Sequence, residues 1–173
     1  EVLVFTPAPE AGIAHLKRRG PRVHVLNTDK AGWKKRLMAL LPQVHGVLCR
    51  LTDRIDEEFL RGALRLEAVS NMAAGLDNVD VKAAAKHGVL VRNTPDVVTA
   101  ATADLTWALI LAVARRIVEG DRMVRQARFK GWKPDLLLGM ELRGKTLGVF
   151  GMGRIGRAVA ERAAGFGMNV MYT

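Results

Sequence analysis

A glycine-rich segment, Gly151-Met-Gly-Arg-Ile-Gly156, constrains the fold more than any other part of the sequence. It follows a short apolar run, Thr146 to Phe150, which has the length and composition of a β-strand. Helix-forming residues follow it, from Arg157 to Phe166, and a second strand is predicted from Asn169 to Thr173. The order strand, tight turn, helix favours a dinucleotide-binding unit over the alternative, a glycine-rich turn that binds nothing.

Glycine is favoured at each of these three positions for a different physical reason. Gly151 allows a sharp turn, Gly153 lets the backbone approach a pyrophosphate, and Gly156 lets the helix lie close to the strand. A helix that begins near Arg154 would point free N–H groups at the same place, which favours an anion. The predicted cofactor is NAD or NADP, because the acidic residue that selects between them is expected about 20 residues after Gly151, at or just beyond Thr173. The predicted cofactor-binding residues of the loop are Gly151, Met152, Gly153, Arg154, Ile155 and Gly156.

The rest of the chain alternates strand and helix patterns, which predicts an α/β fold with a parallel sheet. Asp56 and Asp80 are expected to cap helices, and one long helix is expected from Thr99 to about Val118, beginning with threonine caps. We predict a doubly wound domain over residues 1–96, a connecting helix and arm over 97–144, and the incomplete start of a second domain over 145–173. The strands of the first domain are predicted at 2–5, 23–26, 46–49, 67–70 and 89–92.

The net charge of +10 raises the question of an anionic partner. The basic residues are spread along the chain, and Arg122, Arg125 and Arg128 would form one stripe on a helix. A solvated face or a protein interface is favoured over nucleic acid, because aromatic residues make up only 5% of the chain. No nucleic-acid partner is therefore expected.

The single cysteine, Cys49, excludes a disulfide framework and a cysteine-rich metal site, and no metal is expected. It is predicted to be a small buried residue at a strand end, in a reducing compartment. No apolar stretch approaches the roughly 20 residues needed to span a membrane, and the longest, Leu105 to Ala114, is expected to be a core helix. The first 20 residues lack the apolar region of a signal peptide, so a cytoplasmic location without membrane contact is predicted.

Three segments carry a resemblance to a known family: Asn71 to Asp80, Asn93 to Asp104, and Gly131-Trp-Lys-Pro134 leading to the glycine loop. The chain resembles the N-terminal half of the D-isomer-specific 2-hydroxyacid dehydrogenases, and within them the glyoxylate and hydroxypyruvate reductases. The resemblance implies a flavodoxin-like doubly wound domain followed by the first βαβ part of a Rossmann domain. It also implies NAD(P)H-dependent reduction of a small 2-keto acid to the D-2-hydroxy acid.

The resemblance assigns substrate and cofactor roles to four further residues. The N–H groups of Ala74 and Gly75 would hold the substrate carboxylate, Leu51 would line the other side of the substrate, and Thr102 would lie by the nicotinamide. Taken without the family, Ala74 and Gly75 form an ordinary turn, and Leu51 and Thr102 are core and cap residues. Asp77 and Asp80 are interpreted as turn and cap residues. The histidines are interpreted as structural or surface residues: His15, His24, His45 and His87.

The resemblance further implies that a histidine, a glutamate and an arginine perform catalysis in the later part of the nucleotide domain. These positions lie after Thr173, so no catalytic residue is assigned and the 173 residues alone are expected to be inactive. Residues 99–144 would form a homodimer. The alternative function is a nucleotide-sensing binding protein that is similar to the C-terminal-binding protein corepressors.

Overall fold

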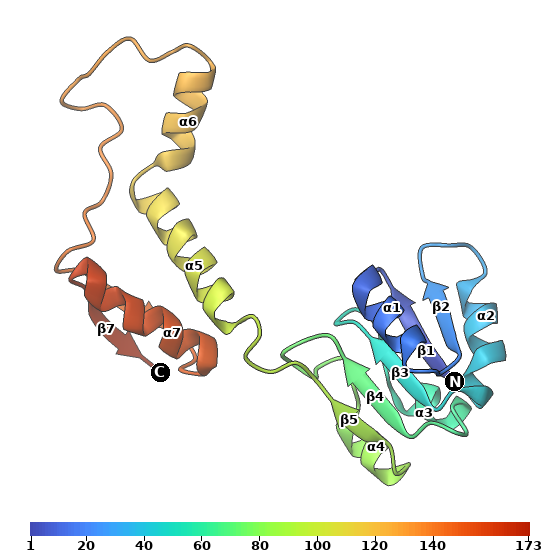
Figure 1. The fold of residues 1–173 in the computed structure, drawn as a ribbon. Helices are drawn as coiled ribbons and strands as arrows, with labels where there is room; N and C mark the ends of the chain where they lie inside the picture. The colour runs from blue at the N-terminus through green and yellow to red at the C-terminus, as the bar shows by residue number, and fades with distance from the viewer. The chain divides into compact units, whose positions relative to one another are not determined.

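A computed structural model describes residues 1–173, which form two compact units, Glu1–Pro95 and Asp96–Thr173. Figure 1 shows the elements in chain order. They are β1 (Val2–Thr6), α1 (Glu10–Arg18), β2 (Val23–Asn27), α2 (Trp33–Leu40), η1 (Leu41–Gln43), β3 (Gly46–Cys49), α3 (Glu57–Gly62), β4 (Ala68–Asn71), α4 (Val81–Lys86), β5 (Leu90–Arg92), α5 (Thr99–Ala114), α6 (Ile117–Arg125), β6 (Thr146–Val149), α7 (Arg154–Ala163), η2 (Ala164–Phe166) and β7 (Asn169–Tyr172).

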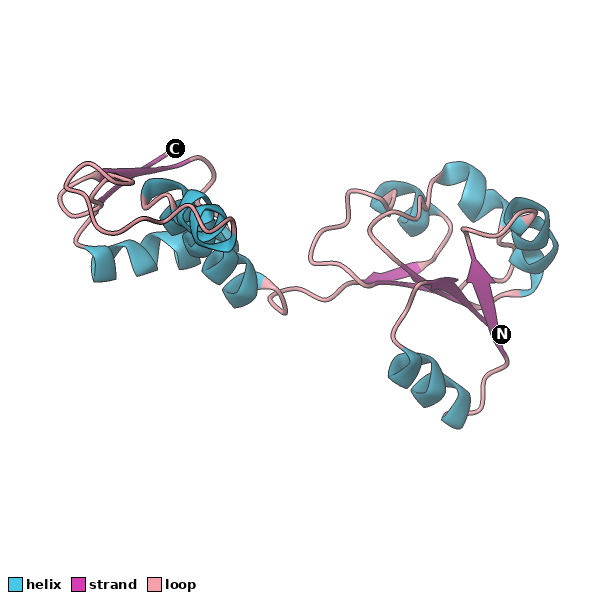
Figure 2. Ribbon diagram, turned by 90° about the horizontal axis from the view of Figure 1, so that it is seen from above, coloured by secondary structure: helices cyan, strands magenta, loops and turns pink.

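The first unit is a five-stranded sheet with the order β2-β1-β3-β4-β5, and every pair of neighbouring strands is parallel. From the central strand β1 the chain moves outward to β2. It then returns across β1 to β3 and continues in this direction to β4 and β5. Right-handed crossovers therefore place α1 on one face and α2, α3 and α4 on the other. Figure 2 shows helices on both faces of this sheet. The predicted α/β fold with a parallel sheet is confirmed.

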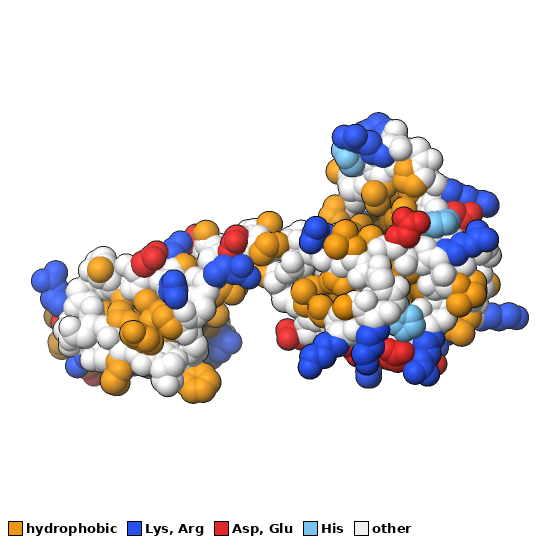
Figure 3. All heavy atoms as spheres, turned by 90° about the horizontal axis from the view of Figure 1, so that it is seen from below, with side chains coloured by type: hydrophobic (Ala, Val, Ile, Leu, Met, Phe, Trp, Pro, Cys, Tyr) orange, Lys and Arg blue, Asp and Glu red, His pale blue; other side chains and the backbone are white.

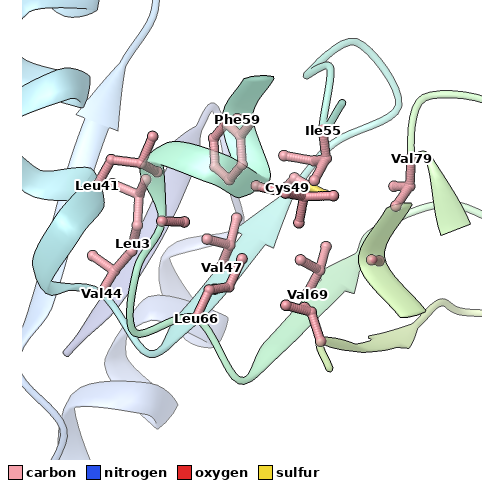
Figure 4. Packing of buried hydrophobic residues seen from close by; sticks show 14 of the residues in the cluster. Leu3, Leu41, Val44, Val47, Cys49, Ile55, Phe59, Leu66, Val69 and Val79 are labelled. Atoms are coloured by element: carbon pink, nitrogen blue, oxygen red, sulfur yellow. The ribbon is translucent and has the colours of Figure 1, made fainter. Parts of the chain in front are cut away.

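The main core lies between the sheet and helices α2, α3 and α4, which cover one face of the sheet. Alternate residues of the strands point to this face, and Leu3, Val47, Cys49 and Val69 are almost completely buried there. Figure 4 shows these side chains packed against residues of the helices and connecting loops. Cys49, at the end of β3, is confirmed as a small buried residue.

Two short helices of this unit begin at the predicted aspartates. The Asp56 carboxylate accepts a hydrogen bond from the Phe59 N–H at 3.0 Å, and the Asp80 carboxylate accepts one from the Ala83 N–H at 2.9 Å. Both bonds satisfy N–H groups that have no partner within the helix. The sequence prediction of the two caps is confirmed.

The second unit combines the parallel pair β6 and β7 with α5 and α7. Trp107 of α5 is buried, stacks on Phe166 with ring centroids 4.3 Å apart, and donates its indole N–H to the Val159 carbonyl of α7 at 2.9 Å. This packing of α5 against α7 was absent from the sequence interpretation. The short sheet leaves Phe150 94% exposed, and Figure 3 shows hydrophobic side chains at the surface of this unit.

The prediction of one long helix from Thr99 to about Val118 is wrong. Helix α5 ends at Ala114, Arg116 adopts the left-handed conformation with φ 54°, and α6 starts at Ile117. The residue before α5 is Val98, and no side chain caps the helix, so the threonine caps are also not observed. Apolar residues resume at Ile117 and Val118, and no glycine or proline marks the break, which explains why the sequence did not reveal it.

The predicted arginine stripe is likewise not formed. Helix α6 ends at Arg125, so Arg128 lies outside it, and the Arg125 guanidinium pairs with Asp121 of the preceding turn. In the view of Figure 3, Lys and Arg side chains are spread over the surface. None of the helices has the length and apolar character that crossing a membrane requires.

Candidate functional site

Two loops at the carboxyl ends of neighbouring parallel strands contain the predicted substrate residues. Leu51 follows β3, and Ala74 and Gly75 follow β4, which pairs directly with β3. The Met72 N–H donates to the Cys49 carbonyl at 2.8 Å and continues the pairing into the loops. The carboxyl edge of a parallel sheet is the usual place for a ligand.

The loop from Ala73 to Gly75 has an unusual distribution of hydrogen bonds. All three of its carbonyl groups accept one, from the Thr94 N–H (3.0 Å), the Asn93 side-chain amide (2.8 Å) and the Asn71 side-chain amide (3.0 Å), respectively. The N–H groups of Ala74 and Gly75 donate to no acceptor in the chain. Two free adjacent N–H groups can bind one carboxylate.

The turn that carries Leu51 is closed by an ion pair. Arg50 and Asp53 form two guanidinium–carboxylate bonds, at 2.9 and 2.6 Å, and the Arg50 N–H also donates to this carboxylate at 2.8 Å. The neighbouring carboxylate raises the pKa of the Arg50 guanidinium. Inside this turn the Leu51 side chain is 59% exposed. It is therefore available to a ligand and is not a core residue.

Asn78 connects the two loops. Its side-chain amide donates to the carbonyls of Arg50 (2.9 Å) and Asp53 (2.8 Å), and its oxygen accepts from the fully buried Asn71 at 2.9 Å. The Cys49 thiol donates to the Asn71 oxygen at 3.3 Å. Burial, together with the charge of Asp53, raises the pKa of the Cys49 thiol to about 12. The thiol is therefore a neutral part of this buried polar network.

The glycine loop of the second unit has the geometry that its motif requires. Gly151 turns with φ +93°, and a Cβ atom on Gly156 would collide with the Gly151 carbonyl oxygen. A Cβ atom on Gly153 would meet nothing within 4 Å, so the space beside this residue is open. Gly153 precedes α7 without a side-chain cap, which leaves the first N–H groups of the helix available to an anion.

A cavity of about 400 Å³ lies against this loop. Gly151, Ile155 and Gly156 line it together with Thr106 of α5. Thr102 lies one turn earlier, and its carbonyl accepts a hydrogen bond from the Thr106 hydroxyl at 2.8 Å. The open space, the glycine conformations and the free N–H groups fit the phosphate part of a dinucleotide.

The remaining loop residues have their own partners. The Arg154 guanidinium pairs with Asp96 at 3.1 Å, and the Met152 carbonyl accepts from the Arg157 guanidinium at 3.3 Å. Both are exposed contacts, which contribute little to stability.

Another cavity, of about 530 Å³, lies at the carboxyl ends of β1, β2 and β3. Phe5, Trp33 and Phe59 form its apolar part, and the paired Arg50 and Asp53 form part of its polar rim. The cavity borders the Leu51 turn, but Leu51, Ala74 and Gly75 do not line it. The charges of Arg50 and Asp53 neutralise each other.

Comparison with known proteins identifies the family. Residues 2–170 match the catalytic domain of the D-isomer-specific 2-hydroxyacid dehydrogenases. The chain belongs to this family. Its members are oxidoreductases, and the resemblance found in the sequence is confirmed.

Among its relatives in this dehydrogenase family, the glyoxylate reductase of Pyrococcus horikoshii is 42% identical over 99% of this chain and 52% of its own length. The glyoxylate reductase of Aeropyrum pernix is 56% identical over 70% of this chain and 38% of its own length. The chain thus spans about half the length of the curated relatives it matches over nearly its whole length.

Solved structures with similar sequences have the same fold. A protein from Thermus thermophilus is 45% identical with a TM-score of 0.89, and 99% of this chain covers 55% of it. The D-lactate dehydrogenase of Aquifex aeolicus, complexed with NAD and lactic acid, is 25% identical with a TM-score of 0.82, and 99% of this chain covers 50% of it.

The sequence alone did not assign roles to Asn71, Asn78 and Asn93. All three lie in the segments that carried the resemblance, and each is close to the end of a strand or to a turn. The available signal for such a role was the position of these asparagines beside a proposed anion-binding turn, because asparagine side chains often hydrogen-bond to the main chain of turns.

The histidines lie away from these loops. His24 contacts Glu1 at 3.0 Å and His87 contacts Glu57 at 3.2 Å, contacts that the spacing of these residues did not suggest. His87, followed by Arg61, lowers the pKa of Glu57. These contacts agree with structural or surface roles.

Proposed function

We propose that this chain forms the N-terminal half of an enzyme that reduces glyoxylate or hydroxypyruvate to the corresponding 2-hydroxy acid, which is the D isomer in the case of hydroxypyruvate, with NADH or NADPH. The free N–H groups of Ala74 and Gly75 carry the proposal, because they offer two donors to the carboxylate of a 2-keto acid. Leu51 would cover the other side of this substrate. Relatives named glyoxylate reductase support the substrate class.

We assign the phosphates of the cofactor to the glycine loop and the neighbourhood of the nicotinamide to Thr102. Bound NAD(P)H would supply the hydride. The chain's own contribution is to hold the substrate carboxylate, to provide the N–H groups at the start of α7 and to line the cavity beside them. We assign no catalytic acid, base or arginine to these residues, and we expect the 173-residue chain alone to be inactive.

These assignments give each part of the chain a proposed role. We propose residues 1–96 as the substrate-binding domain, 97–144 as the connecting helix and dimerisation arm, and 145–173 as the start of the NAD(P)-binding domain. We also propose a cytoplasmic location, in agreement with the absence of cysteine pairs.

Turnover of a 2-keto acid tests the proposal directly. A protein that carries this chain at the length of its relatives should oxidise NADH or NADPH when glyoxylate or hydroxypyruvate is added, measured by the loss of nicotinamide absorbance. The 173-residue chain serves as the control and should give no turnover. If no small 2-keto acid is reduced, the proposed enzymatic activity is refuted. Cofactor binding without turnover would favour the nucleotide-sensing alternative.

A homodimer through residues 99–144 is the second part of the proposal. This segment exposes large apolar side chains, including Trp132 (82% exposed) and Leu138 (67% exposed), which is typical of an interface. In sedimentation experiments, Trp132→Ala should weaken dimerisation by about tenfold or more, as expected for a central aromatic contact. Leu64→Ala, a change to a 78% exposed residue outside the segment, is the matched control. An unchanged dimer in Trp132→Ala would count against this interface.

A further inference from the structure

The direction of a main-chain N–H is fixed by the carbonyl group in the same peptide unit. In a planar trans peptide, the C=O of one residue and the N–H of the next point in opposite directions. The Ala73 carbonyl therefore sets the direction of the Ala74 N–H, and the Ala74 carbonyl sets that of the Gly75 N–H. A group that donates a hydrogen bond to either carbonyl therefore also fixes the direction of the N–H in the same peptide unit.

Both of these carbonyls are held by consecutive residues that follow β5. The Thr94 N–H donates to the Ala73 carbonyl at 3.0 Å, and the Asn93 side-chain amide donates to the Ala74 carbonyl at 2.8 Å. The first bond is a main-chain bond and depends little on the side chain. The second requires the amide of Asn93, which is half-buried and lies 19 residues away in the sequence.

The peptide unit between Ala74 and Gly75 needs such a restraint. Glycine has access to more backbone conformations than other residues, and Gly75 is exposed. If this peptide rotated by half a turn, the Ala74 carbonyl oxygen would replace the Gly75 N–H on the ligand side. A carbonyl oxygen repels a carboxylate, so one rotation would convert a binding group into an opposing one.

We propose that Asn93 is a positioning residue for carboxylate recognition. Its side-chain amide holds the Ala74 carbonyl and thereby aims the Gly75 N–H at the carboxylate of the substrate. Asn93 does not touch the substrate in this role. The inference rests on the proposed function, because it requires that the carboxylate binds at Ala74 and Gly75.

Nuclear magnetic resonance of the isotope-labelled 173-residue chain tests this role, with oxamate as the probe because it carries a carboxylate beside a planar carbonyl group. In the wild-type chain, oxamate should shift the amide signals of Ala74 and Gly75. In Asn93→Ala, the oxamate dissociation constant should rise about tenfold, the size expected for one lost hydrogen bond to a charged group. The Gly75 shift should decrease more than the Ala74 shift, because Thr94 still holds the other peptide unit.

Two further variants separate positioning from stability and from charge. Asn93→Asp keeps the shape of the side chain but replaces the donor by an acceptor, and it should weaken oxamate binding as well. Asn27→Asp, in the same unit, adds the same charge and keeps the side-chain oxygen that accepts from the Asp29 N–H. It should leave the Gly75 shift unchanged, and the free energy of unfolding of every variant is measured in parallel.

The outcomes distinguish the two proposals. If oxamate shifts neither amide in the wild-type chain, the proposed carboxylate site is refuted, and this inference falls with it. If the wild-type chain binds and Asn93→Ala binds equally well with the same Gly75 shift, only the role of Asn93 is refuted. If Asn93→Ala is unfolded, Asn93→Asp decides, and binding equal to that of Asn27→Asp overturns the inference.

Discussion

The two candidate anion-binding loops of this chain present free N–H groups by different means. In the glycine loop, Gly151 turns sharply, Gly156 allows close packing, and the start of α7 supplies unpaired N–H groups. In the loop at Ala74 and Gly75, partners outside the loop hold the carbonyl groups from behind. The first geometry depends on local backbone conformation, whereas the second also depends on Asn93 and Thr94, which are distant in sequence.

The two loops should therefore be sensitive to different substitutions. The glycine loop should be sensitive to any added side-chain atom at its close contact and tolerant elsewhere. The loop at Ala74 and Gly75 should be sensitive to changes in the asparagines behind it.

Gly156→Ala should have the largest effect. The added Cβ atom would collide with the Gly151 carbonyl oxygen, which is backbone and cannot move aside without opening the loop. We expect a loss of about 3 kcal/mol in the stability of the second unit, seen as faster hydrogen exchange across residues 96–173. Gly153→Ala, where the same atom meets open space, should cost less than about 1 kcal/mol. Equal effects at the two positions would contradict the packing argument.

Asn71→Ala should destabilise the first unit by about 2 kcal/mol. The change removes the donor to the Gly75 carbonyl and the partner of Asn78 in a fully buried position. Hydrogen exchange should increase within residues 1–95 and stay unchanged in the second unit. Asn27→Ala, which removes one exposed hydrogen bond, should have an effect below about 0.5 kcal/mol. If the two variants are equally stable, the network does not hold the loop.

The Cys49 thiol should produce a smaller, pH-dependent effect in the first unit. Burial raises its pKa from 9.0 to about 12, so above pH 9 the unfolded chain releases this proton while the folded chain retains it. The thiol's contribution to stability is therefore complete below pH 9 and is lost as the pH rises towards 12. Between about pH 8 and pH 10, the loss should be about 1 kcal/mol.

Cys49→Ala isolates this contribution, since the other groups that titrate in this range are the same in both chains. The free energy of unfolding, measured by urea denaturation at each pH, should decrease less steeply in the variant. Parallel curves for the two chains would show that the thiol ionises equally in the folded and unfolded states.

The sequence was informative where the physical cause was local. The glycine spacing at Gly151 to Gly156 predicted the turn and the start of α7, and Asp56 and Asp80 predicted the two caps. The break at Arg116 was missed because the left-handed residue is an arginine, whereas glycine or asparagine usually marks such a position. The stacking of Trp107 on Phe166 was missed because it joins elements separated by a long connection.

The same reasoning explains the result at the candidate substrate loop. Ala74 and Gly75 could be selected from their resemblance to a family motif. The partner of the Ala74 carbonyl could not, because the pairing of Asn93 with Ala74 depends on β4 and β5 being neighbours in register. An asparagine in a turn has many possible partners, and only the sheet order selects one of them.

The bonds from Asn93 and Thr94 have a mechanical consequence. These residues lie immediately before Pro95, the last residue of the first unit. A change in backbone angles at this junction would pull on both bonds and tilt the two peptide planes that they hold. A substitution that alters the backbone beside Pro95 would therefore change the direction of the Ala74 and Gly75 N–H groups, and with it the binding of an anion.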